Sequence, residues 1–307
     1  MSVAHERAKA IAPEATLTQL LKRTKPAAQS LIVTLFGDCV SQHGDSLWLG
    51  SLIGLLDLFS INERLTRTSV YRLVQDDWLT VQRIGRRSYY RFTTHGQREY
   101  ERTAARVYSS TRPAWDGTWT LAILHDVSGA ARETLRTSLG WIGFGQLAPG
   151  VFARPSADRQ GLTDLIEELA LERHVLVMAA QATPASIAEL AEGRWHLPEL
   201  ARRYRRFLAD FEPLSQLSAR LDPQTCFVVR TLLIHEFRRI VLTDPDLPDS
   251  LLPPGWPGHA AFELTKALYA KVAERSTRFA RTLENEAGAL PEPRAAFHRR
   301  FGRSARR

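Results

Sequence analysis

The chain has 307 residues, of which 44% are hydrophobic and 24% are charged, and its formal net charge is +8. These proportions are those of an ordinary globular protein, and no stretch approaches the ~20 consecutive apolar residues that a membrane span needs. The first residues carry charges and lack the apolar core of a signal peptide, which argues against export and predicts a cytoplasmic protein without a membrane partner. Cys39 and Cys226 each stand alone in an apolar run, which predicts buried free thiols rather than a disulfide or a metal site.

The first third of the chain predicts an arm, three helices and a hairpin. Residues 1–26 are polar and unpatterned, which predicts a flexible arm. Apolar runs at residues 27–40 and 48–59 predict two helices joined by a turn. Asn62 predicts the N-cap of a third helix, residues 62–77, because its side chain can accept a hydrogen bond from the first helical turn.

The third helix is expected to be amphipathic and to be followed by a β-hairpin. Its apolar stripe, at three- and four-residue spacing, consists of Leu65, Ser69, Val70 and Leu73. Residues 78–84 and 88–93 alternate as strands do, and Gly85, Arg86 and Arg87 supply the turn between them. Three helices followed by a hairpin is the order of a winged helix-turn-helix, in which the third helix enters the major groove of DNA.

Basic residues concentrate on the two elements that would face DNA. Residues 62–98 hold eight arginines against three acids. The alternative is a solvated amphipathic helix beside an unrelated hairpin, but the coincidence of order, spacing and charge favours DNA binding. The residues predicted to contact DNA are Arg64, Arg67, Thr68, Tyr71, Arg72, Arg83, Arg86 and Arg87.

The type of each side chain suggests its role at the DNA. Arg64 and Arg67 lie one turn apart near the start of the third helix, where a guanidinium can bond O6 and N7 of guanine. The neighbouring Thr68 and Tyr71 could contact a thymine methyl group or a phosphate. The arginines at the hairpin tip could reach phosphates or a narrow minor groove, with a solvated turn as the alternative.

The middle of the chain predicts a second domain of alternating strands and helices. Residues 109–118, which contain Ser, Pro and Gly, predict a linker. After it come a strand at 119–127, a helix at 131–145, strands at 144–147 and 150–155, a helix at 162–172 and a strand at 174–181. This βαββαβ order is that of a ferredoxin-like domain.

The last third is almost entirely helical. Three long helical patterns are interrupted by a proline-rich loop at residues 244–258, and the last fifteen residues contain six arginines and no acid. The sequence therefore predicts an α+β chain with several parts. These are an arm at 1–26, a winged helix at 27–108, a ferredoxin-like domain at 109–182, a mostly helical domain at 183–290 and a disordered basic tail at 291–307.

Three stretches resemble the phenylacetic acid degradation operon repressor family (PaaX). They are RTSVYRL … GRRSYY in the winged helix, LGWIGFGQLAPGVFARP in the middle segment and DPDLPDSLLPPGWPG near the end, and the resemblance covers residues 27–280. It implies a homodimeric repressor that binds a palindromic operator in double-stranded DNA and controls aerobic phenylacetate degradation genes. It further implies release by an acyl-CoA effector, phenylacetyl-CoA, no cofactor, and a middle domain similar to the nuclease Cas2.

An acyl-CoA effector would need cationic side chains for its phosphates beside an apolar pocket. The candidates on the helical segment are Arg202, Arg203, Arg205, Arg206, Arg238 and Arg239, although a solvated basic face explains each of them as well. Trp141, Phe144 and Phe152 could line a pocket for an aromatic ring, and a packed core accounts for them equally.

The alternative function is a nucleic-acid-processing protein with a metal-dependent, Cas2-like middle domain. Asp126 follows a predicted strand, as the strand-end aspartate of Cas2 nucleases does, but the segment around it is poor in acids, which favours a turn residue. His235 and Glu236 begin like the zinc-protease motif HExxH, yet Arg239 stands where the second histidine belongs. The sequence therefore predicts a protein that is not an enzyme, with no catalytic and no metal-binding residues.

Overall fold

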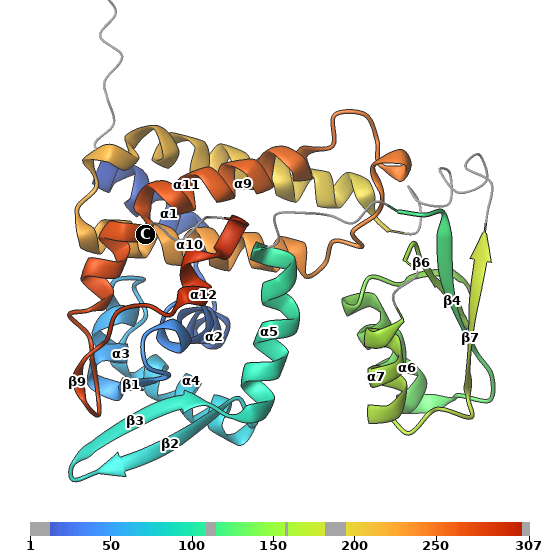
Figure 1. Ribbon diagram of the computed structural model, residues 1–307, viewed down its shortest axis with the longest axis horizontal. Coiled ribbons are helices and arrows are strands. Elements are labelled where there is room, and N and C mark those ends of the chain that lie inside the picture. Colours follow the sequence, from blue (N-terminus) through green and yellow to red (C-terminus); the bar gives the residue numbers. More distant parts are fainter. Residues whose placement is uncertain (1–12, 109–114, 157–158, 182–194, 303–307) are drawn as a thin grey trace, which may run out of the picture. The chain divides into compact units, whose positions relative to one another are not determined.

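The computed structural model describes residues 13–108, 115–156, 159–181 and 195–302. The chain forms two compact units (Figure 1). The first comprises residues 1–110, 207–237 and 261–307, and the second comprises residues 111–206 and 238–260. The predicted helical domain at 183–290 is thus divided between them.

The first unit contains the predicted winged helix-turn-helix. Its elements are α2 (Ala28–Asp38), β1 (Ser46–Trp48), α3 (Leu49–Asp57), α4 (Glu63–Gln75), β2 (Leu79–Ile84), β3 (Arg87–Phe92) and α5 (Thr94–Tyr108). Strand β1 was not predicted. It pairs with β3, so that the sheet order is β1-β3-β2, and the β2–β3 hairpin extends from the helices as a wing (Figure 1). Asn62 caps α4 as predicted, because its side chain accepts a hydrogen bond from the backbone N–H of Leu65 at 2.9 Å.

The buried face of α4 differs from the predicted stripe at one position. Thr66, Ser69, Val70 and Leu73 are buried, whereas Leu65 is 47% exposed. Thr66 satisfies its hydroxyl inside the helix by donating to the carbonyl of Asn62 at 3.0 Å. Because an α-helix repeats every 3.6 residues, position 66 completes the series with 69, 70 and 73, and position 65 turns towards solvent.

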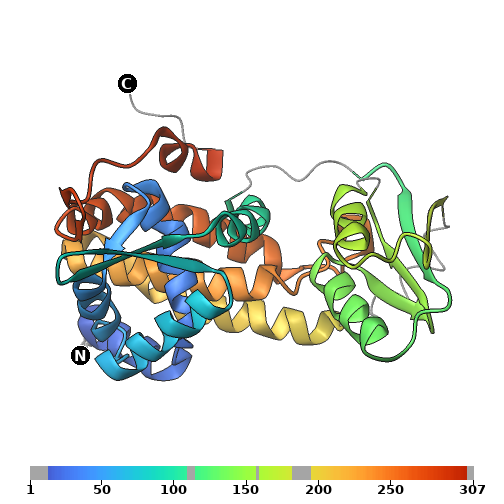
Figure 2. The same ribbon diagram turned by 90° about the horizontal axis from the view of Figure 1, so that it is seen from below.

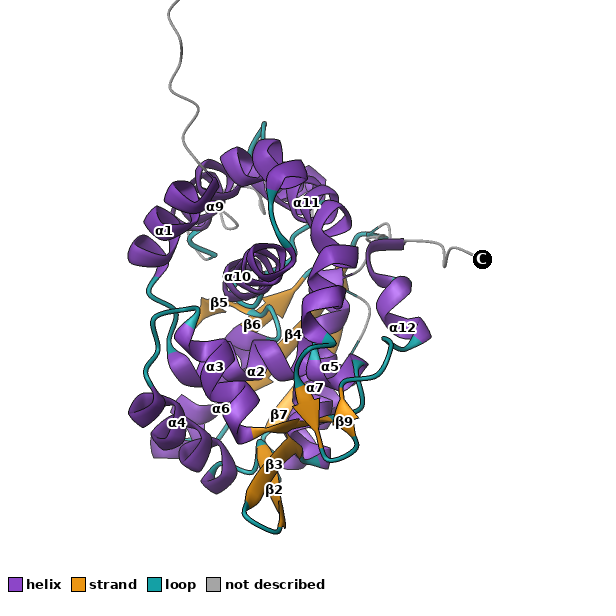
Figure 3. Ribbon diagram, turned by 90° about the vertical axis from the view of Figure 1, so that its left-hand side faces the viewer, coloured by secondary structure: helices purple, strands orange, loops and turns teal. Residues whose placement is uncertain are grey.

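Three long helices complete the structure, and their ends lie in different units. They are α9 (Leu197–Leu217), α10 (Pro223–Val241) and α11 (Pro257–Ala280). In the first unit, α10 lies among α1, α9 and α11 (Figure 3), and its residues from Cys226 to His235 are all buried. Figure 2 shows the winged helix, in blue and cyan, beside the orange C-terminal helices of the same unit.

Part of the predicted N-terminal arm is a helix. Residues 13–24 form α1 (Pro13–Thr24), in which Leu17 and Leu20 are buried and Arg23 forms an ion pair with Asp210. The prediction of an unpatterned arm was wrong for these residues, because two leucines three positions apart suffice to bury one side of a short helix. Residues 1–12 lie outside the described part of the chain.

The predicted disordered tail is also folded over most of its length. After the hairpin of β8 (Glu284–Asn285) and β9 (Gly288–Ala289), the chain forms α12 (Ala295–His298) and buries Phe297, Arg300 and Phe301. The prediction of disorder was wrong up to residue 302. It rested on the basic composition, whereas Phe297 and Phe301 are core residues and Arg300 has a buried carboxylate partner. Residues 303–307 lie outside the described part.

The carboxylate partner of Arg300 is Asp38, the last residue of α2. The side chain of Asp38 is buried, and the residue is 1% exposed. Its Oδ2 accepts a hydrogen bond from Nε of Arg230 in α10 at 2.8 Å, and its Oδ1 accepts one from Nη1 of Arg300 at 2.7 Å. Tyr108 in α5 and Tyr269 in α11 donate their hydroxyls to the same Oδ1 at 2.6 and 3.2 Å. We call these five residues the Asp38 cluster. It joins four helices to the C-terminal segment.

The Asp38 cluster holds two guanidinium groups against one carboxylate. Nη1 and Nη2 of Arg230 find no hydrogen-bond acceptor among the described residues. The rings of Phe227, Tyr269 and Phe297 lie between 5.3 and 5.8 Å from its Cζ, where cation–π attraction operates. Burial would raise the pKa of Asp38, but attraction to the two arginines holds it below its ordinary value. The carboxylate therefore stays charged in the folded protein.

The second unit contains the predicted ferredoxin-like fold. Its elements are β4 (Thr118–Leu124), α6 (Gly129–Trp141), β5 (Gly145–Ala148), β6 (Val151–Arg154), α7 (Gln160–Glu168) and β7 (Val175–Gln181). The sheet order is β5-β6-β4-β7 and every pair is antiparallel, which confirms the βαββαβ prediction, including its short second strand. Helices α6 and α7 pack on one face of the sheet through Leu135, Leu139, Leu162 and Ile166 (Figure 1).

Both cysteines are free and buried, as predicted. Burial raises the pKa of the Cys39 thiol to about 11 and also raises that of Cys226. Both thiols therefore stay protonated at neutral pH and act as small apolar side chains.

Candidate nucleic-acid interface and cavity

The exposed side of α4 gathers the residues that the sequence predicted for DNA contact. Arg64, Arg67, Thr68, Tyr71 and Arg72 are all exposed, and Tyr71 is exposed to 65%. Leu65 also lies on this side, although its spacing placed it in the predicted buried stripe. A signal was present, since Thr66 fits the buried series better by helical spacing.

The two arginines of the first turns differ in their partners. Arg67 donates from Nε to Oε1 of Glu63 at 2.8 Å, and its Nη2 lies 2.7 Å from the same oxygen. Both side chains are more than half exposed, so this pair contributes little to stability, but it orients the guanidinium towards the start of the helix. Within the described chain, Arg64 forms no ion pair, so its whole guanidinium remains for a ligand.

The wing has a shorter turn than predicted. Ile84 pairs with Arg87, so the turn consists of Gly85 and Arg86 alone. Gly85 has φ +59°, and glycine with a positive φ at the first turn position is typical of a type II′ hairpin turn. Arg86 is exposed at the tip, and Arg83 is exposed on β2. Both make no ion pair with another described residue, so both remain available to phosphates.

Arg87 has a structural partner that the sequence did not reveal. It is the first residue of β3, and its Nη1 lies 2.8 Å from Oε2 of Glu284 in β8. Its guanidinium also stacks on the indole of Trp48, with Cζ 4.4 Å from the ring centroid. The C-terminal hairpin thus holds the guanidinium of Arg87 beside Trp48, whereas the neighbouring Arg86 has no such partner among the described residues.

The arginines proposed for an effector differ in burial and in their partners. Arg203 donates from Nη1 to Oγ1 of Thr243 at 2.6 Å and from Nη2 to the carbonyl of Arg239 at 2.7 Å, so it closes the end of α10. Arg238 is buried, and the exposed ones are Arg202, Arg205, Arg206 and Arg239. None of the six lines the cavity described next.

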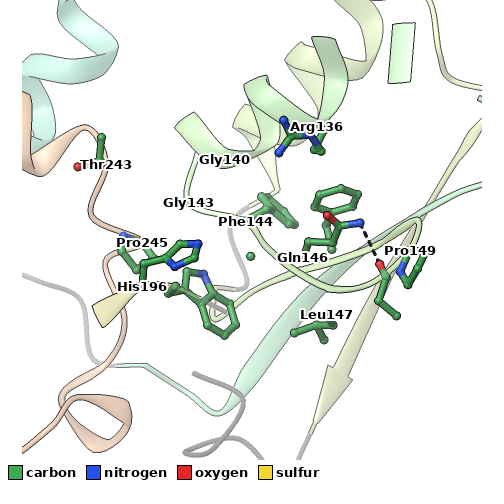
Figure 4. A pocket seen from close by; sticks show the side chains of 14 residues that line it. Arg136, Gly140, Gly143, Phe144, Gln146, Leu147, Pro149, His196, Thr243 and Pro245 are labelled. Carbon is green, nitrogen blue, oxygen red and sulfur yellow. Dashed lines mark hydrogen bonds between the residues drawn. The ribbon is translucent and has the colours of Figure 1, made fainter. Parts of the chain in front are cut away.

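A cavity of about 740 Å³ lies elsewhere in the second unit, along the outer side of β5 (Figure 4). Phe144 and Phe152, which the sequence offered for an aromatic pocket, line it, together with Trp195 and His196. The side chain of Trp141 lies outside the described part. No sequence pattern pointed to Trp195 and His196, because they lie in a segment distant along the chain from the rest of the cavity. The cavity has an aromatic lining, as ligand sites commonly do.

No described feature carries the nuclease alternative. Asp126 has φ +54° in the loop after β4, and its side chain is 91% exposed, as befits a turn residue. Among the described residues, no three His, Cys, Asp or Glu side chains converge to hold a metal ion. In the same part of the chain, no helix is long and apolar enough to cross a membrane.

Comparison with known proteins gives matches over most of the chain. Family models match in order: "PaaX-like protein" at residues 27–96, "PaaX protein central Cas2-like domain" at 112–192 and "PaaX-like protein C-terminal domain" at 195–282. Over 282 residues, 89% of each chain, the sequence is 37% identical to the transcriptional repressor PaaX of Escherichia coli (strain K12). The solved structure of the uncharacterized protein Rv0674 from Mycobacterium tuberculosis matches with a TM-score of 0.51 and 27% identity, covering 81% of this chain and 98% of that one.

Proposed function

Because the chain belongs to the PaaX family, and its relative is a transcriptional repressor rather than an enzyme, we propose that it is a cytoplasmic, ligand-responsive repressor. It binds a palindromic operator as a homodimer, controls genes of aerobic phenylacetate degradation and is released by phenylacetyl-CoA. The observation that carries the proposal is the exposed side of α4, where Arg64, Arg67 and Thr68 stand together beside a basic wing.

This face suits a winged helix that reads DNA. The N-terminal side chains of the third helix contact base edges in the major groove, and the two helices of a dimer enter successive grooves. Arg64 and Arg67 present guanidinium groups for guanine, and Arg83 and Arg86 supply phosphate contacts from the wing. Arg87 is paired with Glu284, so we expect it to contribute less to DNA binding than Arg86.

Release requires that the effector favour a dimer geometry in which the two helices no longer match the groove spacing. The effector can shift that equilibrium only by its difference in affinity for the two geometries. A coupling free energy of ~1–3 kcal/mol weakens operator binding by about 5- to 150-fold.

The test is a titration of fluorescently labelled DNA from the region upstream of the gene, at fixed salt, with and without phenylacetyl-CoA. Free phenylacetate is the control ligand. Release by the thioester alone supports the repressor and its effector. Tight binding without release retains the regulator and refutes the effector. Equal affinity for upstream and random DNA contradicts the proposal for that site.

Arg86→Ala should weaken binding to operator and random DNA alike and reduce the salt dependence by about one phosphate contact. Arg87→Ala removes the same charge, but its guanidinium is engaged by Glu284, so we expect a smaller reduction of the salt slope. Both are measured as affinity against salt concentration. Equal slopes for the two variants would show that the ion pair to Glu284 does not withdraw Arg87 from the DNA.

Leu65 should contact a thymine methyl group, because it is an exposed apolar side chain on the first turns of the reading helix. Replacing single operator thymines by uracil, which removes only the methyl group, should weaken binding of the wild type at one position of each half-site. Leu65→Ala should bind both operators equally. A uracil effect that persists in Leu65→Ala would assign the methyl contact to another residue.

A further inference from the structure

Helix α6 contains a glycine that neither its backbone nor its packing requires. Gly140 lies near the end of α6, outside the positive-φ glycines, and a Cβ built on it would meet no heavy atom within 4 Å. Glycine is less favourable than alanine inside a helix, because it loses more conformational freedom on folding. Gly140 lines the cavity beside β5. A side chain at position 140 would therefore extend from the lining of that cavity.

The inner walls of the cavity are apolar and aromatic. Phe144 and Phe152 belong to the core of the second unit and are 6% and 3% exposed, so they form a firm wall. Trp195 approaches β5 so closely that a Cβ on Gly145 would lie 2.3 Å from its indole. The absence of a side chain at Gly145 thus allows the indole of Trp195 to line the cavity. The cavity volume of about 740 Å³ lies within the range of ~300–1,000 Å³ typical of ligand pockets.

Polar groups stand around the same cavity. Arg136 lies one helical turn before Gly140 and is half exposed, and Glu133 accepts from its Nε and Nη2, which leaves Nη1 for a ligand. Gln146 donates to the carbonyl of Ala148 at 3.3 Å, and His196 lies across the cavity from Arg136 (Figure 4). Strand β5 pairs only with β6 among the described strands, so the backbone groups on its other edge also remain.

We infer that this cavity is the effector site and holds the aromatic acyl group of an acyl thioester. The ring packs against Phe144, Phe152 and Trp195, the thioester carbonyl lies towards Arg136 and Gln146, and the coenzyme part extends into solvent. This inference rests on the proposed function, because it places the effector of that function. It differs from the sequence prediction, which sought the site among the arginines of α9 and α10.

The test fills the cavity from Gly140. Gly140→Leu places a branched side chain in the open space, and Gly140→Ala places one methyl group there. Gly161→Leu is the matched control, because Gly161 lies in α7 of the same unit, also has nothing within 4 Å of a built Cβ, and does not line the cavity. Binding of phenylacetyl-CoA to the full chain is measured by calorimetry without DNA, and release from operator DNA by fluorescence.

Gly140→Leu should lose about ten- to a hundredfold in affinity for phenylacetyl-CoA, and Gly140→Ala should lose less, in proportion to the space filled. Gly161→Leu should bind and respond like the wild type. Wild-type affinity in both Gly140 variants overturns the inference alone. No binding by the wild type overturns both the inference and the proposed effector. Because alanine favours the helix, Gly140→Ala should also melt at or above the wild-type temperature, which keeps the test valid if the leucine variant fails to fold.

Discussion

Asp38→Asn should lower the free energy of unfolding by about 3–5 kcal/mol, as measured by urea denaturation at pH 7. The substitution keeps the shape of the side chain and removes its charge. Arg230 and Arg300, which are 0% and 8% exposed, would then be buried without a counterion. The large expected effect follows from that uncompensated charge rather than from the loss of a hydrogen bond.

The control is Asp45→Asn, which breaks the ion pair between Asp45 and Arg294. The side chains of both residues are about half exposed. Exposed pairs contribute ~0–1 kcal/mol, so this variant should unfold almost like the wild type. Equal, small effects of both substitutions would show that the Asp38 cluster does not require the charge of its carboxylate.

The same carboxylate should make stability depend on acid pH. Because the folded pKa of Asp38 is lowered from 3.8, its contribution is fully present above that value and is lost as the pH falls through the lower, folded value. Wild-type stability should therefore decrease below about pH 4, and Asp38→Asn should show a shallower decrease. Parallel curves for the two proteins would contradict the lowered pKa.

Arg67→Ala should weaken operator binding by about ten- to a hundredfold and leave binding to random DNA much less affected. Its guanidinium is directed by Glu63 on the exposed side of α4, where a bidentate contact to guanine contributes specificity rather than general attraction. Competition titrations of both DNAs at one salt concentration measure the ratio. Arg64→Ala should behave similarly.

The control for the lost charge is Arg205→Ala, since Arg205 is exposed on α9 and belongs to no predicted DNA-contacting element. It should change both affinities little. If Arg67→Ala lost the same factor on operator and random DNA, the guanidinium would contact phosphate, and the reading side of α4 would have to be reassigned.

The elements that the sequence predicted well are those with local signals. Asn62 and Leu65 are three residues apart, so the cap that begins α4 depends on its own turn. The strands of the ferredoxin-like unit follow from short apolar runs between polar turns, and the order of elements selects the fold. The exposed side of α4 was predictable for the same reason, except at Leu65 and Thr66. Leu65 was predicted to be buried, but Thr66 is the buried residue of the two.

What the sequence could not predict depends on distant partners. Arg300 looked like part of a solvated basic tail, because its partner Asp38 is 262 residues away. Arg87 could not be paired with its carboxylate partner, because Glu284 is 197 residues away. The cavity beside β5 could not be predicted either, since Trp195 and Pro245 approach Gly145 and Gly143 only in the folded unit.

The Asp38 cluster should also affect when during synthesis the winged helix becomes stable. The winged helix is made first, yet the counterions of its buried carboxylate are Arg230 and Arg300, which the ribosome adds much later. Until then the end of α2 carries a charge that its own segment cannot bury favourably. We therefore expect the winged helix of a nascent chain to become fully stable only near the end of translation, and a fragment that stops after α5 to be less stable than the whole chain.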